Sequence, residues 1–593
     1  MLAVAACHGT HRPGGAGSGG DGAETDSTSH GMHGHHGSAD DTSGSADEST
    51  GGGPVSDAKF DFPSLGTVND GHFATSRVCA QCHANDDSAL AMRDEVGTPI
   101  GPDDLWRGTM MANSARDPFW WAMVKAETVA TPSRAAEIEA ECTHCHAPMA
   151  AIREDLYGGP LALDDLLDGS SDRAHLALDG VACAACHQIP ATDVLGPPPL
   201  PATGEMFGPH ANPFTMPMQM HTGFTPAAAG HVTESAICGT CHTLRTDALA
   251  EDGTLTGAHL SEQAPYLEWR NSQYTTETAG GADPRSCQDC HMPTRSEGGV
   301  ELSTRIARRP PGGDFPPISD RSPYGRHVLV GGNTWVPAML RDFADELRPK
   351  ASTEDFDATI DAARHMLADM TADVSIVDTS RAADTLSFRV RVDSRVGHKF
   401  PSGVPARRAW LRLRVTDASG TVVFASGGVD DEGRLVDGRG SPLPIESVGG
   451  PVEPHHTVID DDAQVQIFES VLGDADGDAT YRLLRGEAFL KDNRLLPLGW
   501  RTDGPHADET APRLAGTDAD FVGGGDTVTY EVLAPAAAGP YDIEATLWYQ
   551  PIGSRFAAEL FALDAPEIRA FERIWDATDR TPELVGTATA TSL

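Results

Sequence analysis

The sequence is poor in positive charge and contains no long apolar run. Its 593 residues include 44 lysines and arginines against 87 aspartates and glutamates, which gives a formal net charge of −43. Such an anionic excess repels phosphate backbones and anionic lipid surfaces, so no nucleic-acid partner is expected. No stretch reaches the roughly 18 consecutive apolar residues of a membrane-spanning helix, so we expect the chain not to cross a bilayer.

Aromatic side chains are also scarce. They make up 6% of the residues, whereas glycine (62) and proline (42) are abundant. A chain of this length exceeds what one hydrophobic core usually serves, so several domains are expected. With so few aromatic rings, the core must be built from aliphatic side chains or around a bound apolar cofactor.

Ten of the 11 cysteines form five pairs of one pattern, CxxCH, in which a histidine follows the second cysteine. A zinc ribbon has no use for that histidine, a thioredoxin-like motif occurs once, and a disulfide framework belongs to short secreted chains. The pattern is typical of c-type haem attachment, with two thioether links and the adjacent imidazole as proximal iron ligand. The sequence therefore predicts five covalent haem c groups. The attachment residues are Cys79, Cys82, Cys142, Cys145, Cys183, Cys186, Cys238, Cys241, Cys287 and Cys290, and the proximal ligands are His83, His146, His187, His242 and His291.

All five motifs lie between Cys79 and His291, so we expect the haems to supply much of the core of this region. Haems that are close together can pass electrons to one another. Since c-type cytochromes mature outside the cytoplasm, we expect the protein in the cell envelope, in the periplasm or at the outer-membrane surface.

Several stretches resemble the bacterial multihaem c-type cytochromes related to cytochrome c-554. The resemblance covers roughly residues 75 to 560 and implies electron transfer through stacked haems, largely with two histidines on each iron. It rests on the stretches LWRGTMMANSARDPFWWAMV, DGVACAACHQI, HVTESAICGTCHTL, PYLEWRNSQY, SCQDCHMP and GHKFPSGVPARRAWLRLRVTDASGTVVFASG.

The same resemblance suggests distal iron ligands. In that family a W-x-x-S-x-H phrase often supplies a distal histidine, and here Met111 and Tyr274 stand at that position in two such phrases. Met111 is then a candidate ligand, with Met110 as its alternate, or a core methionine. Tyr274 either packs or stands near an open iron. The histidine candidates for distal ligation are His231, His327, His398 and His221, followed by His210, His144 and His175.

The N-terminal stretch Val4-Ala5-Ala6-Cys7 resembles a lipoprotein box, which would make Cys7 a lipid-anchored residue. We therefore interpret residues 1–7 as a truncated signal sequence with its lipobox. Residues 8–57 are rich in glycine, serine and histidine and are expected to form a disordered tether. The run HGMHGHHG at 30–37 either binds a transition metal or is solvated linker.

The fold class that we predict is mixed. Residues 58–300 are expected to form a pentahaem cytochrome c domain of short helices, with coil over 190–226, and residues 301–370 a connector with a helix at 353–370. Alternation of apolar and polar residues predicts an antiparallel, Ig-like β-sandwich over 371–555, with a turn at the DASG stretch. Residues 556–593 are expected to form a helix and a tail. The stretch GGPVEPHHTVIDDD either binds metal through His455, His456 and its three aspartates or is a solvated loop.

The first functional hypothesis is electron transfer through five covalent haems, with other redox proteins of the cell envelope as partners. The alternative is a multihaem oxidoreductase that acts on a small nitrogen or sulfur compound at one open-coordinated haem. The pentahaem nitrite reductases use an attachment motif that ends in lysine at the active haem, and here all five motifs end in histidine. The sequence therefore favours a carrier over a catalyst. A third hypothesis, in which the β-domain mediates assembly or docking and the haems form a conducting array, is compatible with the first.

Overall fold

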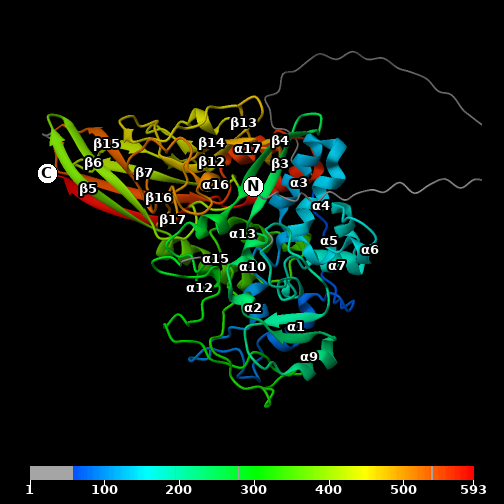
Figure 1. Ribbon diagram of the computed structural model, residues 1–593. Coiled ribbons are helices and arrows are strands. Elements are labelled where there is room, and N and C mark those ends of the chain that lie inside the picture. The colour runs from blue at the N-terminus through cyan, green and yellow to red at the C-terminus, as the bar shows by residue number, and fades with distance from the viewer. Residues whose placement is uncertain (1–57, 194, 278–279, 536–537, 593) are drawn as a thin grey trace, which may run out of the picture. The chain divides into compact units, whose positions relative to one another are not determined.

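The computed structural model describes residues 58–592, apart from residues 194, 278–279 and 536–537. The expected lipid anchor at Cys7, the tether 8–57 and the histidine-rich run 30–37 lie outside the described residues. The fold is mixed, as predicted: short helices dominate up to residue 370 and several antiparallel sheets follow (Figure 1). Within the described part of the chain, no helix combines the length and apolarity needed to cross a bilayer.

Each CxxCH motif lies on a short helix or at its end. Residues three apart on a helix share one face, so this placement turns both cysteines of a motif the same way. The helices concerned are α1 (Ser76–His83), α4 (Ala135–His146), α8 (Cys183–Cys186), α10 (Ala236–Gly239) and α12 (Cys287–His291).

Further helices pack between these motifs. The longest of them begins where Asp117 accepts hydrogen bonds from two backbone amides of the first turn. A 3-10 turn (Pro132–Arg134) precedes the helix that carries the second motif, and no side chain caps the start of that helix. These helices are α2 (Pro102–Trp106), α3 (Pro118–Ala130), α5 (Pro148–Ala151), α6 (Glu154–Tyr157), α7 (Asp172–Leu178) and α11 (Pro265–Arg270).

The proline-rich region 190–226 is more ordered than the coil that we expected. Strand β1 (Glu205–Gly208) pairs in parallel with β2 (Thr225–Ala228), and helix α9 (Thr215–Thr222) lies between them in sequence. A hairpin of β3 (Leu244–Leu249) and β4 (Leu255–Gln263) then follows the fourth motif. The strand sequences LRTDAL and LTGAHLSEQ show no clear alternation of apolar and polar residues, which is why the sequence did not predict the hairpin.

The connector contains α13 (Trp335–Asp342), α14 (Ala344–Leu347) and α15 (Thr353–Met370), and the last of these confirms the helix predicted at 353–370. Ser352 caps α15: its side chain accepts from the Asp355 amide at 3.3 Å, and the Asp355 carboxylate accepts from the Ser352 amide at 2.8 Å.

Two sheets share one hydrophobic core in the region after α15. Phe388 and Tyr530 come from one sheet and Leu413 and Ile543 from the other, and all four are buried in that core. The four-stranded sheet has the order β11 (Val458–Ile459), β15 (Gly525–Leu533), β6 (Thr385–Ser394) and β5 (Ala372–Ala382). The pairing of β11 with β15 is parallel, which departs from the wholly antiparallel arrangement that we expected.

The second sheet has seven strands. Asp417 and Gly420 form the predicted turn between its strands β7 and β8, with Gly420 at a φ of 83°. Its main path is β13 (Ala479–Thr480), β12 (Ile467–Gly473), β7 (Arg408–Thr416), β16 (Tyr541–Gln550) and β17 (Glu583–Ser592), while β14 (Ala488–Asp492) pairs with β12 and β8 (Val422–Ser426) with β7. The remaining short elements here are β9 (Gly428–Val429), β10 (Leu435–Val436) and α16 (Ala507–Thr510).

The C-terminal segment is integrated into the fold, where we expected a helix and tail. After α17 (Ser554–Phe561), helix α18 (Pro566–Ala577) packs on α3, with the rings of Phe119 and Phe571 5.5 Å apart. Strand β17 then joins β16. The C-terminal helices therefore bury their apolar faces in the same cluster as the N-terminal helices, and that cluster also contains stacked Phe60 and Phe62. The first half has a protein-only core beside the expected haem sites.

Candidate functional site: the cavity of the CxxCH motifs

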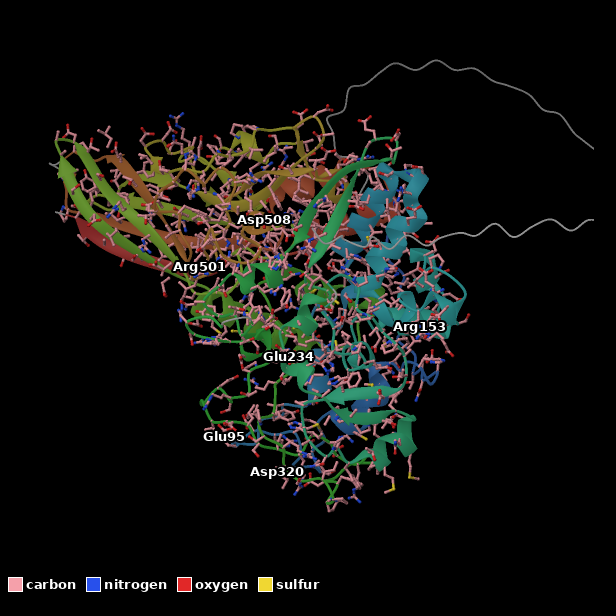
Figure 2. The ribbon with its side chains drawn as sticks, viewed as in Figure 1. Glu95, Arg153, Glu234, Asp320, Arg501 and Asp508 are labelled. Atoms are coloured by element: carbon pink, nitrogen blue, oxygen red, sulfur yellow. The ribbon has the colours of Figure 1, made fainter. Side chains whose placement is uncertain are left out.

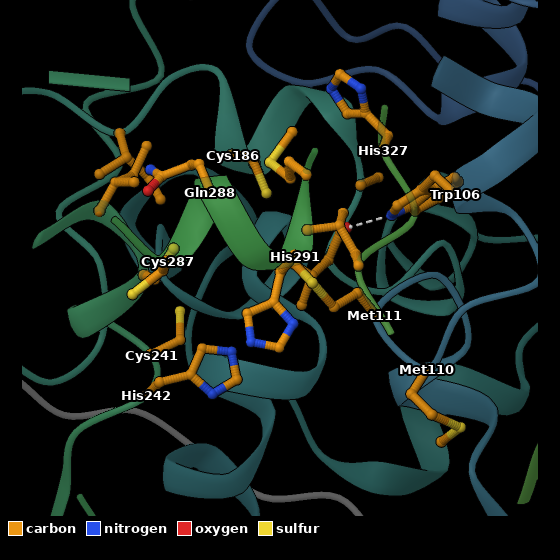
Figure 3. Close-up of a pocket in the computed structure, with 18 of the residues that line it drawn as sticks. Trp106, Met110, Met111, Cys186, Cys241, His242, Cys287, Gln288, His291 and His327 are labelled. Atoms are coloured by element: carbon orange, nitrogen blue, oxygen red, sulfur yellow. Dashed lines mark hydrogen bonds between the residues drawn. The ribbon is translucent and has the colours of Figure 1, made fainter. Parts of the chain in front are cut away.

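One cavity of about 2640 Å³ collects all the predicted attachment residues. Its volume exceeds the roughly 300–1,000 Å³ of an ordinary small-molecule site. The ten motif cysteines and the five histidines that follow them all line it, and Figure 3 shows His242 and His291 with their rings in the same part of it. Residues spread over more than 200 positions of sequence thus meet in one space that could hold several large apolar groups.

None of the ten cysteines forms a disulfide, and each is partly buried. Sulfur atoms of different motifs nevertheless meet. The Cys183 thiol donates to Cys79, the Cys145 thiol to Cys241, and the Cys238 thiol to Cys287, which raises the pKa of each donor. The first motif therefore adjoins the third, the second adjoins the fourth, and the fourth adjoins the fifth. The spatial order differs from the order in sequence.

Four of the five motif histidines have the same orientation. In each, Nδ1 donates to a backbone carbonyl, which fixes the tautomer and leaves Nε2 available to a metal. The acceptors are Ile306 for His83 (2.8 Å), Ser114 for His146 (3.1 Å), Phe207 for His187 (2.6 Å) and Val330 for His291 (2.9 Å). Burial lowers the pKa of His146 and of His291 to about 4, so both rings are neutral at pH 7, as metal ligation requires.

Two of the predicted distal histidines lie opposite motif histidines. The ring of His327 is centred 6.4 Å from that of His187, with 25° between their planes, and His398 is centred 6.4 Å from His291, with 17° between planes. His327 and His398 also donate from Nδ1 to carbonyls, those of Gly325 (3.1 Å) and Lys399 (3.0 Å).

The spacing within each pair fits one metal between two imidazoles. A metal–imidazole bond is about 2.0–2.1 Å and a ring centre lies about 1.2 Å behind its nitrogen, so two such rings on one metal have centres about 6.4 Å apart. Both pairs show that separation, and no hydrogen bond engages their Nε2 atoms within the described residues. These residues could therefore hold an iron with two histidine ligands.

The other ligand candidates are placed less favourably. His231 is directed away from this role, because its Nε2 donates to the Ile189 carbonyl at 2.8 Å and its ring contacts Phe207. His221 lines the cavity, but its Nε2 lies 2.9 Å from the side-chain oxygen of Gln81. Met110, Met111 and His210 also line the cavity.

Tyr274 and the two weakest histidine candidates have protein partners. The Tyr274 hydroxyl donates to the Arg395 carbonyl at 2.9 Å, which favours the packing interpretation. The Nδ1 of His175 accepts from the Gly66 amide at 3.1 Å, and His144 lies 3.9 Å from Glu154. Neither of these histidines lines the cavity.

The sequence did not reveal several residues that shape the cavity. Trp120 stacks on His146 with ring centres 4.6 Å apart and 9° between planes. Arg407 lines the cavity near His242, whose pKa is lowered by burial and then by the Arg407 charge. The carbonyl acceptors carry no sequence signal, because any residue type can supply one.

The second metal candidate is a partly exposed loop whose first histidine has protein partners on both ring nitrogens. The side chain of His455 is buried, and its Nε2 lies 3.0 Å from Asp518. The amides of Gln466 and Asn493 both donate to Nδ1, at 2.8 and 3.1 Å. Backbone contacts fix both amides, so Nε2 carries the proton and donates to Asp518. Although Asp526 completes a group of potential metal ligands, the histidine has no nitrogen to offer. His456 instead contacts Glu453 at 2.7 Å.

Comparisons with known proteins give one similar structure. No protein-family model matches the chain, and no curated protein sequence matches it. The crystal structure of a penta-heme cytochrome c552 from Thermochromatium tepidum is similar over 88% of this chain and 99% of that chain, with 16% sequence identity and a TM-score of 0.44. A similarity of this size does not by itself assign the chain to a family.

Proposed function

We propose that the protein is an electron carrier that holds five covalent c-type haems in the cavity of its CxxCH motifs. The observation that carries this proposal is the convergence of ten cysteines and five histidines on one cavity, with four of the histidines fixed through Nδ1. A bound haem supplies reversible one-electron chemistry at its iron. The chain's own part is to attach, orient and bury it.

Two-histidine coordination is supported at two motifs. We assign His327 as the partner of His187 and His398 as the partner of His291, on their ring separations and free Nε2 atoms. Carbonyl acceptors on both members of a pair hold the rings in place before any metal binds, which reduces the reorganisation that accompanies electron transfer. Ligation on both faces leaves no position for substrate, as a carrier requires.

The adjoining motifs provide the route between the sites. Sulfur contacts join the first motif to the third, the second to the fourth and the fourth to the fifth. Groups attached through those sulfurs are close neighbours, so electrons can pass between the first and third sites and among the second, fourth and fifth.

The envelope location remains part of this proposal, because covalent haem attachment takes place outside the cytoplasm. A lipid anchor at Cys7 would hold the protein at a membrane without spanning it. Partners are expected to be redox proteins with a basic docking surface, given the net charge of −43. Exposed charged side chains such as Glu95, Glu234 and Asp508 project around the described region (Figure 2).

One observation favours an oxidoreductase as the second candidate. Within the described residues, His242 has no carbonyl acceptor for Nδ1 and no facing imidazole like those of His187 and His291, and the cationic Arg407 is near it. An open position beside an arginine could bind a small anion. Carbon monoxide separates the two functions: a large spectral change on addition to the reduced protein supports the oxidoreductase, and an unchanged spectrum supports the carrier.

The direct test of the proposed function is a pyridine haemochrome count combined with low-temperature EPR on the protein matured in a host that attaches c-type haem. Five haems per chain, with low-spin signals from two-histidine sites, are expected. Colourless protein, or free thiols at the ten motif cysteines, would overturn the proposal.

A further inference from the structure

Two carboxylic side chains are buried in the wall of the cavity beside the second motif. Glu127 on α3 and Glu262 on β4 are 4% and 6% exposed, and both line the cavity. Together they are the charged groups with the strongest influence on the Cys142 thiol, whose pKa is raised by burial first and then by Glu262 and Glu127. The electron-carrier function uses neither of them.

The Glu262 carboxylate has hydrogen-bond partners in Thr246 and Gln263, whereas those of Glu127 are incomplete. The Glu262 Oε2 accepts from the Thr246 hydroxyl at 3.0 Å, and the Glu127 Oε1 accepts from the Leu483 amide at 2.7 Å. The Glu127 Oε2 is buried and has no hydrogen-bond partner among the described residues. A buried carboxylate oxygen without a donor is costly when ionised, and protonation removes that cost.

The nearby cations do not form ion pairs with the two carboxylates. Arg485 donates to the carbonyls of Leu249 and Ala130 and to the Thr131 hydroxyl, and Arg482 donates to the Glu559 carbonyl at 3.0 Å. Neither arginine lies within ion-pair distance of Glu127 or Glu262 in the described structure, although both lower the pKa of Glu127 from a distance. Further negative charge comes from Glu139 and Glu141 on α4, of which Glu139 accepts from the Leu163 amide at 3.1 Å.

These surroundings make Glu262 titratable near neutrality. Burial, followed by the charge of Glu127, raises the pKa of Glu262 to about 7 against the partial opposition of the Thr246 hydroxyl. Burial also raises the pKa of Glu127. A carboxyl with a pKa near the working pH changes its protonation when a charge nearby changes.

We propose that Glu262, supported by Glu127, is a proton-binding site coupled to the redox state of the second haem site. This inference rests on the proposed function. If the second motif holds a haem, attached through Cys142 and Cys145 with His146 on its iron, its reduction by a one-electron donor protein would remove one positive charge from the site. One proton from solvent then converts the Glu262 carboxylate to the carboxylic acid, so the local charge is conserved. Oxidation releases the same proton.

The test is a potentiometric titration of the holoprotein, followed by absorption and EPR, from about pH 5.5 to about pH 9. One midpoint potential is expected to fall as the pH rises through neutrality, with a slope that approaches about 59 mV per tenfold change in proton activity for a one-electron couple. Below that window Glu262 is protonated in both redox states, and above it ionised in both, so the potential levels off.

Three variants make the test specific. Glu262→Gln is expected to abolish the pH dependence of that one potential, and Glu127→Gln to move it to lower pH, because the Glu127 charge no longer raises the Glu262 pKa. Glu141→Gln is the matched control: it removes an exposed carboxylate next to Cys142 and should leave the dependence in place. Redox-difference infrared spectra should show a carboxylic C=O band in the reduced protein that Glu262→Gln lacks.

A pyridine haemochrome count distinguishes failure of the proposed electron-carrier function from failure of the proposed proton-binding site. If the haems are absent, the proposed function fails. If all five haems are present and every midpoint potential is independent of pH, or if the dependence persists unchanged in both Glu262→Gln and Glu127→Gln, the proton-binding site is overturned. Should Glu262→Gln not fold, the wild-type titration, the Glu127→Gln shift and the infrared band decide the question.

Discussion

The imidazole of His398 lies opposite that of His291, with ring centres 6.4 Å apart and 17° between the planes. His291 ends the helix of the fifth motif, whereas His398 belongs to the loop between β6 and β7 of the two packed sheets. A loop residue that joins the two C-terminal sheets thus lies beside the fifth motif in the N-terminal half. The next residue reinforces this junction, since the Lys399 amide donates to Glu268 at 2.9 Å.

Replacing His398 by alanine should open the iron at the fifth motif. We expect His398→Ala to keep five haems, to lose one low-spin EPR component and to bind carbon monoxide at one reduced haem, because the position opposite His291 becomes vacant. His365→Ala, which changes an exposed histidine on α15, should leave all three properties unchanged. An identical low-spin count and no carbon monoxide difference in His398→Ala would exclude His398 as a ligand.

Replacing His327 by methionine should raise one midpoint potential. The His187 site would then have methionine–histidine ligation, which raises the reduction potential relative to two histidines. The measurement is a potentiometric titration at fixed pH, with His365→Met as the surface control. Five midpoint potentials equal to those of the wild type would show that His327 does not bind the iron opposite His187.

Removing the charge of Asp492 should destabilise the fold strongly. Asp492 is buried between Lys399 Nζ at 2.6 Å and the Arg494 guanidinium at 2.8 Å. In Asp492→Asn these cations lose their counter-charge in a low-dielectric interior, which costs about 3–5 kcal/mol. Guanidinium unfolding followed by circular dichroism measures the loss. Asp503→Asn, at an exposed ion pair, should change stability by less than about 1 kcal/mol.

The pKa of Asp492 also predicts how the stability of the protein changes with pH. The charges of Arg494 and Lys399 hold the pKa of Asp492 at about 2, below its ordinary value of 3.8, despite the opposing effect of burial. Its stabilising contribution is therefore fully present above about pH 4 and is lost as the pH falls toward 2. The free energy of unfolding of the wild type should fall as the pH drops from about 4 toward 2, because the contribution of Asp492 is lost. Asp492→Asn should lack this part of the decrease. Parallel curves for the two proteins would contradict it.

Truncating Phe571 should loosen the contact between the C-terminal helices and α3. The ring of Phe571 is fully buried against Phe119 and lies 6.1 Å from the Trp575 ring. Phe571→Ala is expected to cost about 3–5 kcal/mol, because it leaves a cavity in a packed core. Leu533→Ala, at a side chain that is 73% exposed, is the control. A loss below about 1 kcal/mol in Phe571→Ala would show that α18 contributes little to the core.

The sequence indicated the attachment residues because their signal is local. A CxxCH pattern is complete within five consecutive residues, so it needs no knowledge of the fold. The facing pairs could not be derived in that way: His187 and His327 are separated by 139 other residues, and nothing near either of them encodes their proximity. Glu262 was missed for the same reason, since its charged neighbour Glu127 comes from α3, far earlier in the sequence.

The fold was predictable where periodicity was strong. Helix α15 has an apolar face and a capping box, and β6, β7, β15 and β16 alternate clearly, so these elements were predicted. Strand β17 reads ELVGTATATS, where small residues weaken the contrast between its faces. The extended conformation of β17 is therefore determined by its pairing with β16 and not by the pattern of its own side chains. The parallel β11–β15 pair is likewise fixed by tertiary contacts.

The neighbour relations of the motifs have one more consequence. The fourth motif adjoins both the second and the fifth through sulfur contacts, and the pKa of Cys186 in the third is raised by burial first and then by the charge of Cys241. If each motif holds a haem as proposed, the haems would form a branched array with the fourth site at the branch point. Electrons that enter through the first and third sites would then have two ways out, through the second site and through the fifth, so one molecule could reduce two acceptors. Loss of the fourth motif would separate these three branches from one another.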